Sequence, residues 1–232
     1  MNCHEFPRPP LPKKGVKLFS GAKDWQHNAC VGYMDIDMSW DAYAEGFKTA
    51  ADQIVEDILE NRVGPIDVLV YPVVFLYRQY LELRLKELII VGARLHHESA
   101  DVPIKHDLLK LWALVRPRLE EVWPTESTRE YNEAVEEGLR QFCDVDPGSY
   151  AFRYPVDNKG VPVLGCIDHI NLRQVKDVIA GISTVLDGSS IGMGEYLDAK
   201  HEMLAEYRSE TAALQAEMRA EMDDEMRQFY EP

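Results

Sequence analysis

The sequence lacks the long apolar segments and the short motifs that identify many protein classes. Its longest nearly uncharged apolar run, residues 68–77, is far shorter than the roughly 20 residues of a membrane-spanning helix. The first ten residues have no apolar core of the kind found in signal peptides, so we expect a cytoplasmic protein. There is no glycine-rich phosphate loop, dinucleotide fingerprint, nucleophile elbow or His-Glu-x-x-His motif. Generic nucleotide-binding, hydrolase and metalloprotease functions therefore lose support.

Cysteine is scarce, and its spacing does not suggest a metal site. The four cysteines form no Cys-x-x-Cys pair, so we predict no metal and no cofactor. A site built from Cys3, His4, His27 and Cys30 would require the N-terminal segment to fold back. We expect reduced thiols packed in a cytosolic core. The four cysteines of the chain are Cys3, Cys30, Cys143 and Cys166.

Positive charge is also scarce. The chain has 25 Lys and Arg against 40 Asp and Glu, a formal net charge of −15. This balance argues against a protein that coats nucleic acid non-specifically, because neutralising phosphates needs clustered Lys and Arg. Eleven acidic and four basic residues follow position 194, which accounts for about half of the excess. The rest of the chain is only mildly acidic and leaves room for a local basic pocket.

The sequence does contain strong helical periodicity. Apolar residues recur at steps of three and four in several segments, which predicts an all-α fold. We expect a bundle of about five core helices followed by a long C-terminal helix. We expect Pro72 and Pro117 to kink or break their helices and Asp187-Gly188-Ser-Ser to end the fifth. The expected helices cover residues 39–61, 65–94, 106–122, 125–142, 171–186 and 193–229.

One section, residues 144–165, is rich in turn-forming residues rather than periodic. Its Asp157-Asn-Lys-Gly160 segment favours a hairpin-like turn, and its prolines limit it to an edge ribbon. We therefore expect a short β-like ribbon near 150–165. The expected organisation is an extended arm over 1–23, a helical bundle over 24–188 and a long acidic helix over 189–232. The apolar stripe of that last helix is narrow and rich in Met, so it would lie along the bundle or pair with a second subunit.

Three charged residues interrupt the otherwise apolar second helix. Arg78, Glu82 and Lys86 follow one another at steps of four and share one helix face. If this face is exposed, they form a ladder of ion pairs worth roughly 0.2–0.5 kcal/mol each. If it is buried, they need partners from elsewhere, because an unpaired buried charge is very costly. Both interpretations stay open.

Two later segments could supply these partners. His106 stands beside Asp107 at the start of the third helix, and capping explains Asp107 but not His106. Arg153 lies between Phe152 and Tyr154 in the turn-rich section. We expect Arg153 either to reach the charged face of the second helix or to bridge to Asp144, Asp146 or Glu82.

Four groups of residues together resemble a branch of the HEPN-like helical proteins, over residues 64–186. They are Tyr71-Pro, Phe75-Leu-Tyr-Arg-Gln-Tyr-Leu-Glu-Leu-x-Leu-Lys86, His106-Asp-Leu-x-x-Leu-Trp112 and Phe152-Arg-Tyr-Pro155. HEPN-like domains are prokaryotic and occur in toxin–antitoxin modules, phage defence and RNA processing. The resemblance implies a helical bundle, often dimeric through its helices.

Many HEPN members are metal-independent ribonucleases with an Arg-x(4–6)-His motif. In them the histidine handles protons at the 2′-hydroxyl or leaving oxygen, and the arginine stabilises phosphoryl charge. None of the seven histidines here has an arginine five to seven positions before it. The nuclease motif of the family is therefore missing.

Three hypotheses follow. The first is a non-catalytic HEPN-like binding or assembly module linked to defence or toxin–antitoxin systems. The second is a divergent metal-independent ribonuclease or nucleotide-handling enzyme with a composite site. There Arg78 and Arg153 would bind phosphate or carboxylate, His106 would act as acid or base, and Glu82 would orient an arginine.

The third is an acidic regulator that binds a partner through its C-terminal helix. We expect a homodimer formed through helices, a protein or RNA partner, and no membrane association.

Overall fold

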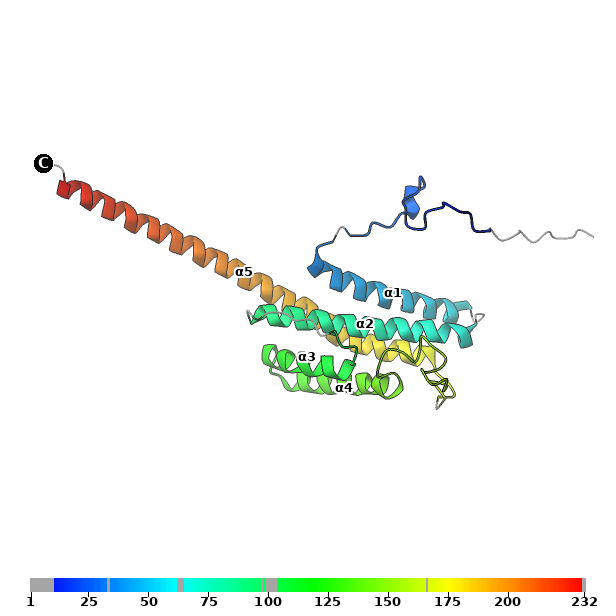
Figure 1. Ribbon diagram of the computed structural model, residues 1–232. Helices are drawn as coiled ribbons and strands as arrows, with labels where there is room; N and C mark the ends of the chain where they lie inside the picture. Colours follow the sequence, from blue (N-terminus) through cyan, green and yellow to red (C-terminus); the bar gives the residue numbers. More distant parts are fainter. Residues whose placement is uncertain are drawn as a thin grey trace, which may run out of the picture. The chain divides into compact units, whose positions relative to one another are not determined.

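A computed structural model describes residues 11–32, 34–61, 65–96, 98, 104–165 and 167–230. This part of the chain is all-α and contains five α-helices (Figure 1). They are α1 (Ile36–Asn61), α2 (Ile66–Leu95), α3 (Leu108–Val122), α4 (Glu126–Val145) and α5 (Leu172–Tyr230). No helix in the described ranges is both long enough and apolar enough to cross a bilayer.

The chain divides into two units, residues 1–35 and 36–232. The described part of the first unit contains only the short 3₁₀ helix η1 (Trp25–His27). The Asn28 side chain closes a loop beside it by bonding both the backbone N and the backbone O of Ala22, at 2.9 and 2.8 Å. Residues 11–32 are all exposed, including Cys30, so the expected burial of that thiol is wrong. Of the predicted arm, residues 1–10 lie outside the described residues, as do Cys3, His4 and Cys166.

The second unit is built around α2. This helix packs against α1, α3 and α5, while α4 packs against α3 and α5. Its apolar side chains are buried on several sides, among them Tyr77, Leu81 and Leu85, each with no exposed surface. A helix covered on so many sides has little room for solvated charge, so its charged residues have to find partners within the protein.

The starts of two helices follow from capping residues in the sequence. Asp107 caps α3 by accepting a 3.1 Å bond from the backbone N of Lys110, and Thr125 caps α4 through a 3.1 Å bond from Thr128 N. Pro72 and Pro117 lie inside α2 and α3, and neither ends its helix. Buried apolar residues, Val73 and Val74 after Pro72 and Val115 and Leu119 around Pro117, hold each helix together despite the missing N–H.

The predicted end of the fifth helix at residues 187–190 is wrong, because α5 runs unbroken through them (Figure 1). Asp187 and Ser190 do not cap a helix end: their side chains contact Tyr80, Arg84 and Glu87 on α2. Polar residues that usually terminate a helix are retained within this one by tertiary partners. The boundary expected at residue 189 therefore falls inside a single helix.

The predicted β-like ribbon is also wrong, since the described residues contain no strand. The segment holds one isolated antiparallel bridge, between Val156 and Pro162. The turn itself is present: Asp157 N donates to Val161 O at 2.8 Å, and Gly160 has a φ of +79°. Pro155 and Pro162 have no N–H to donate, so the ladder cannot extend from this pair.

Candidate functional site

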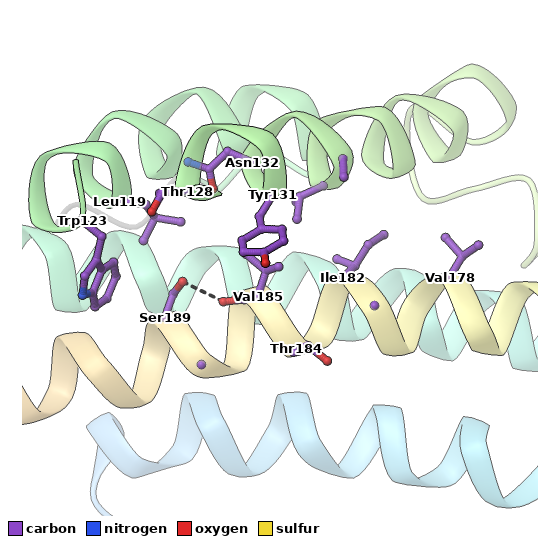
Figure 2. Close-up of a pocket in the computed structure, with 14 residues that line it drawn as sticks. Leu119, Trp123, Thr128, Tyr131, Asn132, Val178, Ile182, Thr184, Val185 and Ser189 are labelled. Carbon is purple, nitrogen blue, oxygen red and sulfur yellow. Dashed lines mark hydrogen bonds between the residues drawn. The ribbon is translucent and has the colours of Figure 1, made fainter. Parts of the chain in front are cut away.

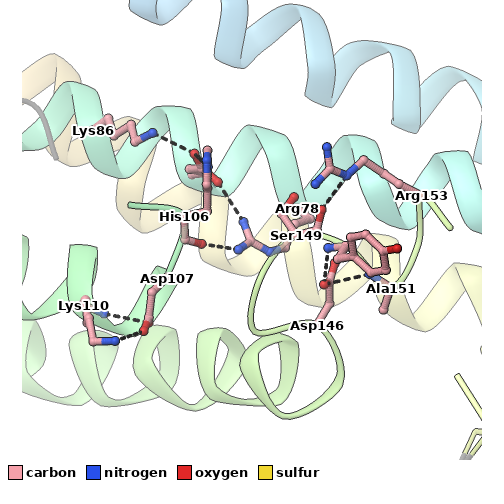
Figure 3. Close-up of polar contacts among 11 residues, drawn as sticks. Arg78, Lys86, His106, Asp107, Lys110, Asp146, Ser149, Ala151 and Arg153 are labelled. Carbon is pink, nitrogen blue, oxygen red and sulfur yellow. Dashed lines mark hydrogen bonds and ion pairs between the residues drawn. The ribbon is translucent and has the colours of Figure 1, made fainter. Parts of the chain in front are cut away.

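The charged face of α2 is buried, and its groups bind one another and His106 (Figure 3). Arg78 has no exposed surface and Glu82 is 2% exposed, so the exposed-ladder interpretation is wrong. Glu82 Oε2 accepts from Arg78 Nη1 at 3.2 Å, and its Oε1 accepts from Lys86 Nζ at 2.7 Å. Arg78 Nη2 also donates to the backbone carbonyl of His106. We call Arg78, Glu82, Lys86 and His106 the Glu82 network.

Glu82 is the centre of this network and is held as a carboxylate. Burial alone would raise its pKa, but the hydrogen bonds from Lys86 and His106 and their positive charge outweigh burial and hold the pKa below its ordinary value. Removing any one of these donors would leave a buried charge short of partners. The Glu82 network therefore ties the segment before α3 to the middle of α2.

His106 is the exposed member of the network. Its Nδ1 lies 2.7 Å from Glu82 Oε1, and its side chain is 61% exposed. A carboxylate can only accept, so Nδ1 donates this hydrogen bond and Nε2 is the ring nitrogen left toward solvent. None of the described residues bonds Nε2. The pair has the form of a carboxylate–histidine dyad open to solvent.

Arg153 does not join the Glu82 network. Its Nε donates to the backbone carbonyl of Ser149 at 2.5 Å, and its guanidinium lies over the rings of Phe75 and Tyr154. It makes no ion pair with Asp144, Asp146 or Glu82. The structure thus brings together three of the four residues that the sequence proposed for a site: Arg78, Glu82 and His106.

A second charged cluster, which the sequence pattern did not predict, surrounds the buried Arg84 with residues of three helices. Arg84 Nη1 bonds Asp41 Oδ1 at 2.8 Å and also Glu87, while its Nε lies 2.8 Å from Asp187 Oδ1. Ser190 Oγ donates to Glu87 Oε1 at 2.8 Å. The available signal was the placement of Arg84 and Glu87 in the same apolar helix as Arg78. We call these five residues the Arg84 cluster.

The Arg84 cluster holds three carboxylates against one guanidinium. Burial raises the pKa of Glu87 and of Asp187, and the attraction of Arg84 offsets only part of that effect. The cluster joins α1, α2 and α5 around a guanidinium that is 3% exposed, which is the arrangement of a structural tie. Nowhere in the described chain do three or more His, Cys, Asp or Glu side chains lie so that they could hold a metal ion.

A groove of about 700 Å³ lies between α4 and α5, with the ends of α3 and α4 beside it (Figure 2). Tyr131 reaches from α4 toward Val185 on α5, and none of the described residues that line the groove is charged. The hydroxyls of Thr184 and Ser189 are bonded to backbone carbonyls of their own helix, those of Ala180 and Val185. The groove offers apolar surface but no acid, base or charge for a reaction.

Comparisons with known proteins add no further constraint. No family matches the chain, and neither a curated protein nor a solved structure does. The likeness to HEPN-like proteins thus rests on the motifs of the sequence alone.

Proposed function

We propose that this protein is a non-catalytic, HEPN-like assembly module in which the end of α5 binds a second copy of the chain. The supporting observation is the exposed part of α5, residues 201–227, in which no residue is buried. At a rise of about 1.5 Å per residue, this part is about 40 Å long. Six of its large apolar side chains are 57–66% exposed: Met203, Tyr207, Leu214, Met218, Met222 and Met226.

The spacing of these side chains fits a two-stranded coiled coil. Leu204, Tyr207, Thr211, Leu214 and Met218 alternate at steps of three and four, the pattern of a and d positions in a heptad. Such a seam needs a partner with the same periodicity and length, and a second copy supplies both. A stripe facing the core of a globular protein would be wider.

The flanking charges favour a parallel pair. In a parallel coiled coil Glu210 of one copy faces Gln215 of the other, and Glu217 faces Met222, so the positions that flank the seam over residues 204–218 bring no like charges together. In an antiparallel pair Glu210 would face Glu217 and repel it. Five of the exposed apolar side chains lie on or beside this seam: Met203, Tyr207, Leu214, Met218 and Met222. If each buries roughly 100 Å², two copies would cover roughly 1,000 Å², the minimum for a specific interface.

The test is the mass of the full chain in solution by light scattering or sedimentation, over a range of concentrations. We expect a dimer, and we expect Tyr207→Glu with Leu214→Glu to give a monomer, because both carboxylates would enter the apolar seam. The matched control is Ser209→Glu with Ala216→Glu, which adds the same charges seven residues apart on the opposite face and should leave the dimer intact.

A wild-type monomer at all concentrations would overturn the proposal and favour the acidic regulator that binds a different partner. Equal dissociation of both double variants would also count against it, because added charge alone would then explain the loss. A dimer that survives the seam variant would place the interface elsewhere.

A second candidate function is acid–base catalysis, favoured by the Glu82–His106 dyad. The buried carboxylate fixes the ring and its tautomer, and Nε2 remains open to take a proton from a substrate hydroxyl. A divergent metal-independent ribonuclease or nucleotide-handling enzyme would need such a base.

Cleavage of RNA should then persist with a chelator and disappear in His106→Ala. It should persist in His201→Ala, the control variant, which changes a histidine on the exposed part of α5. If the wild-type chain cleaves no RNA, the ribonuclease form of this candidate fails.

A further inference from the structure

The loop between α4 and α5 holds one arginine in a fixed position without pairing it to a carboxylate. Arg153 is exposed, and its single hydrogen bond within the described chain is from Nε to Ser149 O. Both Nη atoms therefore have no partner there. Available carboxylates are abundant in a chain with 40 acidic residues against 25 basic ones.

Aromatic rings fix the orientation of the guanidinium. Its Cζ lies 5.8 Å from the centroid of the Phe75 ring on α2 and 5.7 Å from that of Tyr154. Tyr154 in turn stacks on Tyr150 with centroids 4.6 Å apart. Contacts of this kind favour a cation over the ring face and reduce the freedom of the side chain. The arginine is thus ordered before any ligand arrives.

The turn that supplies the Ser149 carbonyl is itself tightly held. Ser149 has a φ of 58°, the only positive value among the described residues other than glycine, and it is 4% exposed. Asp146, which is 1% exposed, accepts at Oδ1 from Tyr150 N at 2.5 Å and Ala151 N at 2.9 Å. Strained backbone persists where surrounding contacts determine it, and it is concentrated at ligand sites. Here the turn places the carbonyl of Ser149 where it accepts a hydrogen bond from Arg153 Nε.

Arg153 borders a hollow of about 500 Å³, within the usual range for small-molecule sites. Among the described residues, Arg153 is the only charged one in its lining, which otherwise consists of apolar residues and two tyrosines. Tyr71 is 47% exposed, so its ring has surface left for a ligand, whereas the Tyr154 ring already contacts Tyr150 and Arg153. Pro155 and Pro162 line the same hollow.

We propose that this hollow binds a small ligand with a flat ring and a terminal oxyanion, either phosphate or carboxylate. The two Nη groups match the paired oxygens of such an anion, and this fork geometry is what distinguishes Arg from Lys. The ring lies against Tyr71 and the prolines, where stacking and burial of apolar surface add affinity. This site is independent of the seam on α5, and neither proposal requires the other.

The test is calorimetric titration of the full chain with adenosine monophosphate and with 4-hydroxybenzoate, which separates a phosphate ligand from a carboxylate one. Adenosine and phenol serve as the same rings without the anion. We expect at least one anionic probe to bind, and its neutral counterpart to bind at least about tenfold more weakly. Arg153→Ala should weaken the anionic probe at least about tenfold, and Arg153→Lys should recover only part of the loss.

Arg173→Ala is the matched control, because it removes an exposed arginine of α5 outside the hollow and should leave binding unchanged. Melting temperatures of both variants should stay within a few degrees of the wild type, since Arg153 lies at the surface. The proposal is overturned if neither anion binds, or if Arg153→Ala binds them as well as the wild type does. Equal binding of the neutral rings would also overturn it, because the arginine would then play no part.

Discussion

At the scale of single residues, the buried acids of α2 differ in what holds them. Glu82 is surrounded by donors and has a lowered pKa, whereas Glu87 shares Arg84 with Asp41 and Asp187 and has a raised pKa. Two glutamates five residues apart on one helix therefore contribute to stability in opposite ways as pH changes. Their tertiary partners, rather than their identity, set the sign.

We expect Glu82→Gln to lower the free energy of unfolding at pH 7 by about 3–5 kcal/mol, because Arg78 and Lys86 would be left short of a counter-charge. Since the folded pKa is lowered, the stabilisation by Glu82 is present above its ordinary value of 4.5 and is lost as pH falls through the folded value. The deficit of the variant should therefore shrink on acidification. Denaturant unfolding at pH 7, 5 and 3.5 measures it.

Glu87→Gln is the matched comparison and should behave in the opposite sense. With a raised folded pKa, Glu87 stabilises the folded state most fully below 4.5, and this contribution is lost as pH rises through the folded value. Acidification should therefore favour the wild type over Glu87→Gln. The same pH trend in both variants would contradict the lowered pKa of Glu82 in its network and the raised pKa of Glu87 in the Arg84 cluster.

At the scale of elements, two glycines of α5, Gly188 and Gly192, have different roles: one lies in the open and the other lies at a packing contact. A Cβ on Gly188 would meet nothing within 4 Å, whereas one on Gly192 would lie 2.8 Å from the Trp123 ring. Gly192 thus lets the end of α3 approach α5 closely. Gly188 has no such role, and its flexibility only weakens the helix.

We expect Gly188→Ala to raise the free energy of unfolding by about 0.5–1 kcal/mol, the helix preference of Ala over Gly. Gly192→Ala should raise the free energy of unfolding by less or should lower it, because the rigid indole ring of Trp123 has to move. Denaturant unfolding of the two variants gives the comparison. If the helix instead ended at residue 187, Gly188→Ala would not stabilise the protein. That result would contradict an α5 that runs unbroken through residue 188.

At the scale of the whole molecule, α5 has a part buried in the bundle and an exposed part with different expected roles. Met193 is 1% exposed, Trp123 packs near Tyr196 with ring centroids 6.1 Å apart, and Lys200 Nζ donates to the carbonyl of Leu95. After these contacts no described residue of the helix is buried. Stability of the fold and self-association should therefore be separable.

We expect a chain that ends after His201 to be monomeric and to unfold with the same free energy as the monomeric seam variant, within about 0.5 kcal/mol. A chain that ends after Gly188 should lose about 2–5 kcal/mol, because it lacks Met193 and the bond from Ser190 to Glu87. Circular dichroism and denaturant unfolding measure both. Equal destabilisation by the two truncations would show that the exposed part also supports the bundle.

The sequence by itself determined the helical class and most helix starts, because periodicity and capping are local. Asp107 and Thr125 cap the helices that follow them. The spacing of Arg78, Glu82 and Lys86 placed them on one face but left open whether that face is exposed or buried. Only the tertiary structure decided that the face is buried and what its partners are. Asp187 and Ser190 have the local chemistry of a helix stop, yet Arg84 and Glu87 bind them and the helix continues. Arg153 has the charge for the Glu82 network, but the strained turn at Ser149 holds it beside Phe75 instead. A pairing between residues distant along the chain depends on how the helices pack, and no local pattern encodes that.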